Sequence, residues 1–249
     1  MPRSVMYRAM IVALTMSIAA AGCGGNSKKP PASTSAAPSP ASSTPTTAPP
    51  SYSPDQIKAK LLGPNDIAPG MASTPQGYVT FPTGKIPACS LTPFGLAGNP
   101  ETTSRILRNP KDQTRYKTFL QITARYASPQ SAATDFAALE KALKACPAKR
   151  HVPPKKVTGN TSLAPHDDVW KLTEESAKPW PHLHADETET EPPGYTKHNV
   201  FNYYYDYVQV GNLLLTSVYL ERTNPGEKTA DIAQRAATIL GRQLQKLAQ

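Results

Sequence analysis

A proline-rich segment near the N-terminus limits how much of this chain can fold. Residues 24–53 are almost all Gly, Ser, Thr, Ala or Pro, with seven prolines and one large apolar side chain, Tyr52. Such a composition cannot bury enough apolar surface to offset the conformational entropy lost on folding. We therefore predict a disordered tether over residues 23–53 and one folded domain over residues 54–249.

The residues ahead of this segment have the three parts of an export signal. Arg3 and Arg8 form a positively charged start, residues 9–21 are mostly apolar, and Gly22 ends a run of small side chains. An apolar helix of that length spans roughly 20 Å, which is shorter than the ~30 Å core of a bilayer. We therefore predict a signal peptide over residues 1–22 rather than a transmembrane helix.

Cys23 follows the apolar run directly. The sequence Ala20-Ala21-Gly22-Cys23 resembles the lipobox of bacterial lipoproteins, with Ala20 in place of the usual leucine. The resemblance implies that a diacylglyceryl group joins the Cys23 sulfur and that signal peptidase II cuts before this residue. Acyl chains such as palmitate would then hold the protein on the outer face of the cytoplasmic membrane. The alternative is an ordinary secretory signal followed by a chance cysteine.

Charge and motifs exclude several classes of function. The formal charge is +9, or about +7 without the two arginines of the export signal. A basic surface suits anionic lipid headgroups or envelope polymers, or is simply solvated. We expect no nucleic acid partner for an exported chain. The sequence contains no GxSxG, HExxH, Walker, GxGxxG or EF-hand pattern. We therefore expect a protein that is not an enzyme and needs no cofactor.

Hydrophobic periodicity predicts both strands and helices in the folded part. Residues 117–126, 200–210 and 213–221 alternate as strands, and Gly211-Asn212 joins the last two as a hairpin. Helices are predicted after Ser53-Pro54, after Ser128-Pro129 and over about 227–247. A weaker strand surrounds Trp170. Because strands and helices do not alternate regularly, we predict an α+β fold in which helices pack against an antiparallel sheet.

Two cysteines remain once Cys23 carries lipid. An even pair in an exported domain favours a disulfide between Cys89 and Cys146. Cys146 also ends the apolar stripe of its helix, which would hold it against the core. A catalytic thiol or a metal-binding pair is the alternative, but neither cysteine lies in a CxxC motif.

The order of these features resembles the PknH-like extracellular sensor domain, which occurs in actinobacterial lipoproteins and outside some receptor kinases. The resemblance covers about residues 53–249. It is carried by Leu61-Leu62, the strand ending in Arg125-Tyr126, the helix with Phe136, Leu139, Leu143 and Cys146-Pro147, the Trp170 strand, the Gly211-Asn212 hairpin and the closing amphipathic helix. It implies an α+β domain with a cleft for an unidentified ligand, and it transfers no individual binding residue.

A row of aromatic side chains is the first candidate binding site. Phe201, Tyr203, Tyr205 and Tyr207 share one face of the predicted strand, where flat rings with polar tips could bind a sugar or an apolar ligand. Asn202 and Asp206 add hydrogen-bonding groups on the same strand. The tentative ligand site is therefore Asn202, Tyr203, Tyr205, Asp206 and Tyr207. The competing interpretation is that the aromatic row packs beneath the helices.

His182 and His184 are the best metal candidates in the sequence. Imidazoles suit zinc or copper, and on a strand two residues at this spacing point to one side. Four prolines flank the pair, namely Pro179, Pro181, Pro192 and Pro193. They favour an exposed acidic loop instead, so we predict no metal site.

These observations favour a lipid-anchored protein with a non-catalytic sensing or binding domain. Its partners would be the membrane, through Cys23, and a small-molecule or envelope-polymer ligand. One alternative is a carrier of an apolar or lipid-like molecule in the cell envelope, with the tyrosine strand lining a cavity. A hydrolase without a recognised motif is the other.

Overall fold

The computed structural model describes residues 49–74, 81–112, 114–158, 161–177 and 179–249. The predicted signal peptide, Cys23 and most of the predicted tether lie outside the described residues. The described residues from 49 onward belong to one compact unit. Within it lie the helices α1 (Pro54–Lys60), α2 (Pro64–Ile67), α3 (Pro129–Lys144) and α4 (Ala230–Ala248), and a short 3-10 helix, η1 (Cys89–Leu91).

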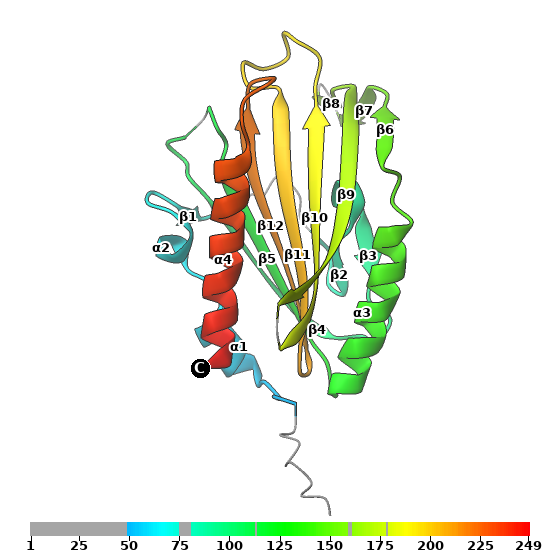
Figure 1. Ribbon diagram of the computed structural model, residues 1–249, viewed down its shortest axis with the longest axis vertical. Coiled ribbons are helices and arrows are strands. Elements are labelled where there is room, and N and C mark those ends of the chain that lie inside the picture. The colour runs from blue at the N-terminus through cyan, green and yellow to red at the C-terminus, as the bar shows by residue number, and fades with distance from the viewer. Residues whose placement is uncertain (1–48, 75–80, 113, 159–160, 178) are drawn as a thin grey trace, which may run out of the picture. The chain divides into compact units, whose positions relative to one another are not determined.

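An eight-stranded antiparallel sheet dominates the domain (Figure 1). Its strands, in spatial order, are β1 (Ala72–Ser73), β4 (Glu101–Arg108), β5 (Thr118–Arg125), β12 (Leu213–Thr223), β11 (Val200–Val210), β10 (Trp180–Thr190), β9 (His166–Ala177) and β6 (Lys149–Val152). Two small hairpins lie beside it, formed by β2 (Lys85–Pro87) with β3 (Pro93–Gly95) and by β7 (Lys155–Thr158) with β8 (Thr161–Leu163). The fold is therefore richer in sheet than the predicted α+β arrangement.

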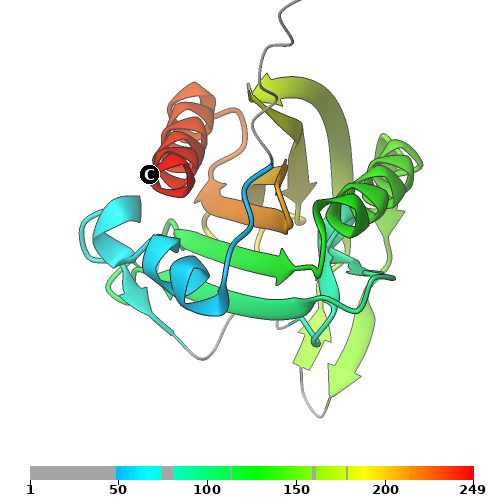
Figure 2. The ribbon, with the colours of Figure 1, turned by 90° about the horizontal axis from the view of Figure 1, so that it is seen from below.

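Helices cover both faces of this sheet. Figure 2 shows α3 and α4 on opposite sides of the curved strands. Beneath α3, the apolar positions of Phe136, Leu139 and Leu143 pack against the odd-numbered side chains of β11. On the other face, α4 packs Ile232, Ala236 and Ile239 against Tyr204 of β11 and Tyr219 of β12, together with side chains of the α1–α2 region. The twofold side-chain period of β11 therefore decides which residues meet which helix.

The helix starts agree with their predicted caps. Ser53 caps α1 and forms a reciprocal capping box with Gln56, and Ser128 caps α3 with Pro129 at the first helical position. The folded part nevertheless begins earlier than predicted, because Tyr52 is buried. Its amide donates to Asn212 Oδ1 at 2.8 Å and its hydroxyl donates to the Leu247 carbonyl at 3.1 Å. The last residues of the predicted tether thus belong to the domain.

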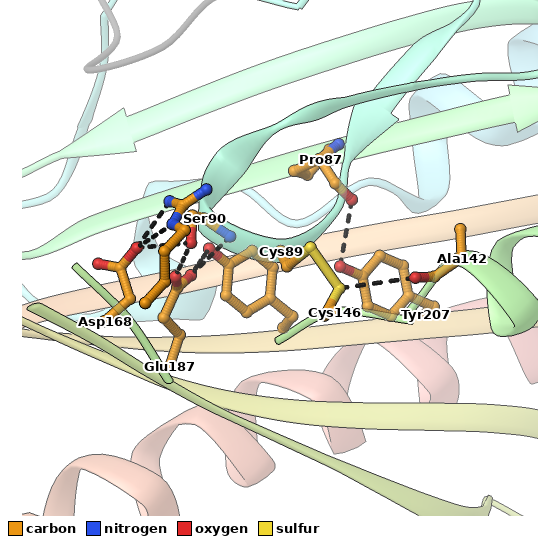
Figure 3. Close-up of a disulfide and its surroundings, with 10 residues drawn as sticks. Pro87, Cys89, Ser90, Ala142, Cys146, Asp168, Glu187 and Tyr207 are labelled. Carbon is orange, nitrogen blue, oxygen red and sulfur yellow. Dashed lines mark hydrogen bonds and ion pairs between the residues drawn. A yellow bond between two sulfur atoms is a disulfide. The ribbon is translucent and has the colours of Figure 1, made fainter. Parts of the chain in front are cut away.

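A disulfide joins Cys89 in η1 to Cys146 just beyond α3, with the two Cα atoms 6.0 Å apart (Figure 3). This is the pairing that the sequence predicts. The bridge holds the β2–η1–β3 segment against the C-terminal end of α3.

Candidate functional site

The structure divides the five residues of the tentative ligand site between the two faces of β11. Tyr203, Tyr205 and Tyr207 are at most 2% exposed and belong to the core beneath α3. Neighbouring rings in this row stack with centroids 6.2–6.3 Å apart. The tyrosine row therefore offers no open platform to a ligand, and the core interpretation is correct for it.

Each of these tyrosines also has a partner for its hydroxyl. Tyr205 donates to Glu187 Oε2 at 2.5 Å. Tyr207 donates to the Pro87 carbonyl at 3.1 Å (Figure 3). Tyr203 donates to Glu189 Oε2 at 3.1 Å. Buried tyrosines commonly satisfy their polar tips in this way, so the row is a structural feature of the core.

Asn202 and Asp206 point to the opposite face, toward α4. The amide of Asn202 donates to Thr223 Oγ1 at 3.0 Å and to the Glu221 carbonyl at 3.2 Å, which ties β11 to β12. Asp206 instead faces two histidines of β10. Of the five tentative residues, Asp206 alone lines the groove described below.

His182 and His184 lie on a regular strand, which corrects the prediction of a loop. β10 is hydrogen-bonded to β9 on one side and β11 on the other, and His184 lies directly opposite Asp206 in the β10–β11 register. Pro181 is tolerated because it lies at the start of β10, outside the run that pairs with β11. Both imidazoles point to the α4 side, as strand periodicity predicts.

These three residues form one tight cluster. His182 Nε2 lies 3.0 Å from Asp206 Oδ1, and His184 Nδ1 lies 2.8 Å from the same oxygen. The other ring nitrogen of His184 lies 3.1 Å from Asp186 Oδ1. His182 and Asp206 are about 5% and 4% exposed, so the cluster is shielded by the protein on most sides.

The electrostatics of this cluster favour charged groups. Burial disfavours the imidazolium of His184, but hydrogen bonds to Asp186 and Asp206 outweigh it and raise the pKa of His184 to about 10. Burial likewise opposes ionisation of Asp206, but hydrogen bonds from His182 and His184 lower the pKa of this carboxyl. The site is therefore an ionic one beneath α4.

A groove of about 560 Å³ opens beside the cluster. Asp206, His182 and His184 form its polar wall. The opposite wall is one side of α4 and consists of Ala230, Ala233, Gln234, Ala237, Leu240, Gly241 and Leu244. Four of these residues are alanine or glycine, and their small side chains leave unfilled space between α4 and the histidines.

A second polar cluster lies on the other face of the sheet, next to the disulfide (Figure 3). The Ser90 hydroxyl lies within hydrogen-bonding distance of the carboxylates of Glu187 and, at 3.0 Å, of Asp168, and the Ser90 amide donates to Glu187 Oε2 at 3.0 Å. Arg150 pairs with Asp168 at 2.6 Å. Ser90 has φ of 50°, a left-handed conformation that its hydrogen bonds to the carboxylates support. The cluster anchors the Cys89–Leu91 turn to the sheet.

Within the described residues, two groups of side chains have the spacing to hold a metal ion, namely His182 with His184 and Asp206, and His166 with Asp168 and Glu189. In the second group, the guanidinium of Arg150 already supplies positive charge to Asp168, and a cation would have to compete with it. The first group offers two imidazoles and lines the groove, so solvent ions can reach it. It is therefore the better cation site.

The described part of the chain also contains a small apolar cavity of about 30 Å³, lined by Leu91, Ile106, Thr118, Leu120, Tyr203, Val218 and Leu220. This volume accommodates about one water molecule. It is too small for an acyl chain or another large apolar molecule.

The sequence contains part of the signal for this site. The His-x-His spacing and the polar Asp206 within an apolar strand are both visible, but local patterns present them as separate features. Only the register between β10 and β11 brings them together.

Among the residues that the structure describes, no helix is both long and apolar enough to cross a membrane.

Comparisons with known proteins give a structural match but no sequence match. No family model and no curated protein matches the chain. The structure is similar to the crystal structure of the extracellular domain of PknH from Mycobacterium tuberculosis, with 11% sequence identity and a TM-score of 0.49. The match covers 79% of this chain and 98% of that chain.

Proposed function

We propose that this chain is a lipid-anchored protein of the outer face of the cytoplasmic membrane, whose folded domain binds a ligand in the groove beneath α4 without transforming it. The observation that carries this proposal is the buried Asp206 with its two histidines in the wall of an open groove.

The cost of burying these groups supports a binding role. A strand position that only had to pack against α4 would carry an apolar side chain, because burying ionisable groups costs free energy even when they are paired. Val208 and Val210, further along the same face of β11, are apolar core residues of this ordinary kind. Asp206 departs from this apolar pattern at the position where the groove opens. A ligand bound in the groove can offset the free energy that burying the carboxylate costs.

The composition of the groove supports binding rather than catalysis by a hydroxyl, thiol or amine nucleophile. Its ten lining residues include no serine, threonine, cysteine, lysine or tyrosine. A nucleophile with a neighbouring base is the usual arrangement for such catalysis. Ser90, which lies beside Glu187 and Asp168, is occupied as an anchor on the other face of the sheet. The cavity between Leu91, Ile106 and Tyr203, at about 30 Å³, would not hold the large apolar molecule that the carrier alternative requires.

Native mass spectrometry of the protein purified from the membranes of its own host tests this proposal. We expect a retained ligand to appear as a mass adduct. Ala237→Trp should fill the groove and remove the adduct, because this exposed residue lines the hollow. Thr238→Trp is the matched control. Thr238 is next to Ala237 and is also exposed, but it does not line the groove. A protein without any adduct, or an adduct retained equally in both variants, would contradict the proposal.

A further inference from the structure

We propose that His182, His184 and Asp206 bind one divalent transition-metal ion of the zinc and copper class. This inference rests on the proposed function, because the ion would be the ligand that the groove binds or the part of it that contacts the sheet. Two imidazoles and one carboxylate are a ligand set that suits zinc and copper.

The distances within the cluster are close to those of a coordinated ion. Metal–nitrogen and metal–oxygen bonds of about 2.0–2.2 Å place neighbouring ligand atoms of a tetrahedral site about 3.3 Å apart. Here Asp206 Oδ1 lies 3.0 Å from His182 Nε2 and 2.8 Å from His184 Nδ1, and all three atoms lie within 4.8 Å of one another. An ion can replace the protons that now join these atoms with side-chain movements of about 1 Å or less.

Asp186 completes the arrangement that a metal-binding histidine usually has. A histidine that ligates through one ring nitrogen commonly donates the other N–H to a carboxylate, which fixes its tautomer and orientation. When His184 Nδ1 faces the ion, His184 Nε2 remains 3.1 Å from Asp186 Oδ1. The carboxylate outside the cluster therefore holds the ring in the orientation that coordination requires.

The backbone also prepares the site. The three ligands come from β10 and β11, adjacent strands inside the eight-stranded sheet, and their register sets His184 opposite Asp206. Ligands on hydrogen-bonded strands lose little freedom on binding, which favours affinity. Three protein ligands leave at least one coordination position, and the groove beside them gives water or an anionic group of a second molecule access to it.

Titration of the untagged full-length protein in detergent with Zn²⁺, and separately with Cu²⁺, tests this inference. We expect one equivalent to bind, with nitrogen hyperfine structure in the Cu²⁺ paramagnetic resonance spectrum. His184→Gln should weaken binding by more than about 100-fold, and Asp186→Asn should weaken it about 10- to 100-fold through loss of the orienting hydrogen bond. His151→Gln is the matched control, because this histidine also contacts an aspartate but is mostly solvent-exposed.

Folding is monitored by circular dichroism, and Asp186→Asn keeps the test decisive because its side chain is 42% exposed. Absence of stoichiometric binding by the wild type, or equal binding by wild type, His184→Gln and Asp186→Asn, would overturn the metal inference. An organic adduct that disappears in Ala237→Trp but persists in His184→Gln would overturn it while leaving the groove function standing. Failure of the groove function itself would show as an adduct unaffected by Ala237→Trp.

Discussion

At the scale of single residues, each face of the central sheet buries carboxylates, and the groups that pair with these carboxylates differ between the two faces. Asp206 is held by two imidazoles on the α4 side. Asp168 is paired with Arg150, and Glu187 accepts from Ser90 and Tyr205 on the α3 side. Burial raises the pKa of Glu187 against the effect of those donors. The α4 cluster lines a groove of about 560 Å³, and this open space beside buried charges is what favours it as a binding site.

The tyrosine row provides a test at this scale. Tyr205→Ala should lower the free energy of unfolding by about 3–5 kcal/mol, because a fully buried aromatic side chain is removed from the core. Tyr195→Ala should change it by no more than about 0.5 kcal/mol, since Tyr195 is 59% exposed. Urea denaturation measures both values. A small effect of Tyr205→Ala would return the row to consideration as a binding surface.

Glu189 should make stability depend on pH. Burial raises the pKa of Glu189 to about 7; His166 and a hydrogen bond from Tyr203 lower it, and the charges of Asp168 and Glu191 raise it. Because the folded state holds this proton more tightly than the unfolded state, its contribution to stability is present below about pH 4.5 and is lost as pH rises to about 7.

Replacing the Glu189 carboxyl with an amide should abolish this pH-dependent loss of stability. Between about pH 4 and 8, Glu189→Gln should gain roughly 1–3 kcal/mol of unfolding free energy relative to the wild type. Chemical denaturation at a series of pH values measures the difference. A difference that stays constant over this range would show that Glu189 does not titrate in the expected window.

At the scale of elements, the β11–β12 hairpin anchors the start of the folded chain. Gly211 has φ of 57°, and a Cβ at this position would lie 1.7 Å from the Pro50 carbonyl oxygen. The Asn212 amide donates to that same oxygen at 3.3 Å. Gly211 is thus required both for the turn and for the close approach of the segment that precedes α1.

Gly211→Ala should therefore destabilise the domain by more than the left-handed backbone alone costs. Gly84→Ala is the matched control, because Gly84 has φ of 73° but no atom lies within 4 Å of the position that its Cβ would take. We expect about 1–2 kcal/mol for Gly84→Ala and a larger loss for Gly211→Ala. Thermal unfolding of both variants compares them. Equal losses would mean that the Pro50 contact contributes nothing.

The Cys89–Cys146 bridge is the second test at this scale. It closes a loop with a sequence separation of 57, and the chain-entropy relation assigns such a loop about 4 kcal/mol. Reductant should lower the melting temperature of the wild type but leave that of a Cys89→Ala/Cys146→Ala double variant unchanged. Two free thiols in the natively purified protein would contradict the bridge.

Local patterns predict some elements and miss others for identifiable reasons. α3 and the β11–β12 hairpin are predictable because caps, apolar periodicity and turn residues agree there. β10 is missed because prolines at both ends and a run of acidic residues resemble a loop. Its acidic residues Glu187 and Glu189 point inward to tyrosine hydroxyls, which no local pattern reveals.

At the scale of the whole molecule, the candidate site depends on contacts between distant segments. His184 and Asp206 are 22 residues apart in sequence, and α4 follows them both. The sequence identifies the histidines and the aspartate as candidates. The β10–β11 register is needed to bring them together, and the packing of α4 is needed to form the groove. Likewise, sequence patterns place the start of the domain near residue 54, and only the contacts of Tyr52 extend it toward the N-terminus.

The proposed anchor determines where this domain would act, and it is tested with the whole chain in cells. Cys23→Ser should abolish incorporation of labelled palmitate, because the thioether to the diacylglyceryl group requires a sulfur atom at this position. The variant should remain uncut or leave the membrane fraction. Cys89→Ser is the matched control, since the same substitution there leaves Cys23 available and the label should be retained. Metabolic labelling with membrane fractionation measures both properties. Continued labelling of Cys23→Ser in the membrane fraction would show that another feature of the chain holds it there.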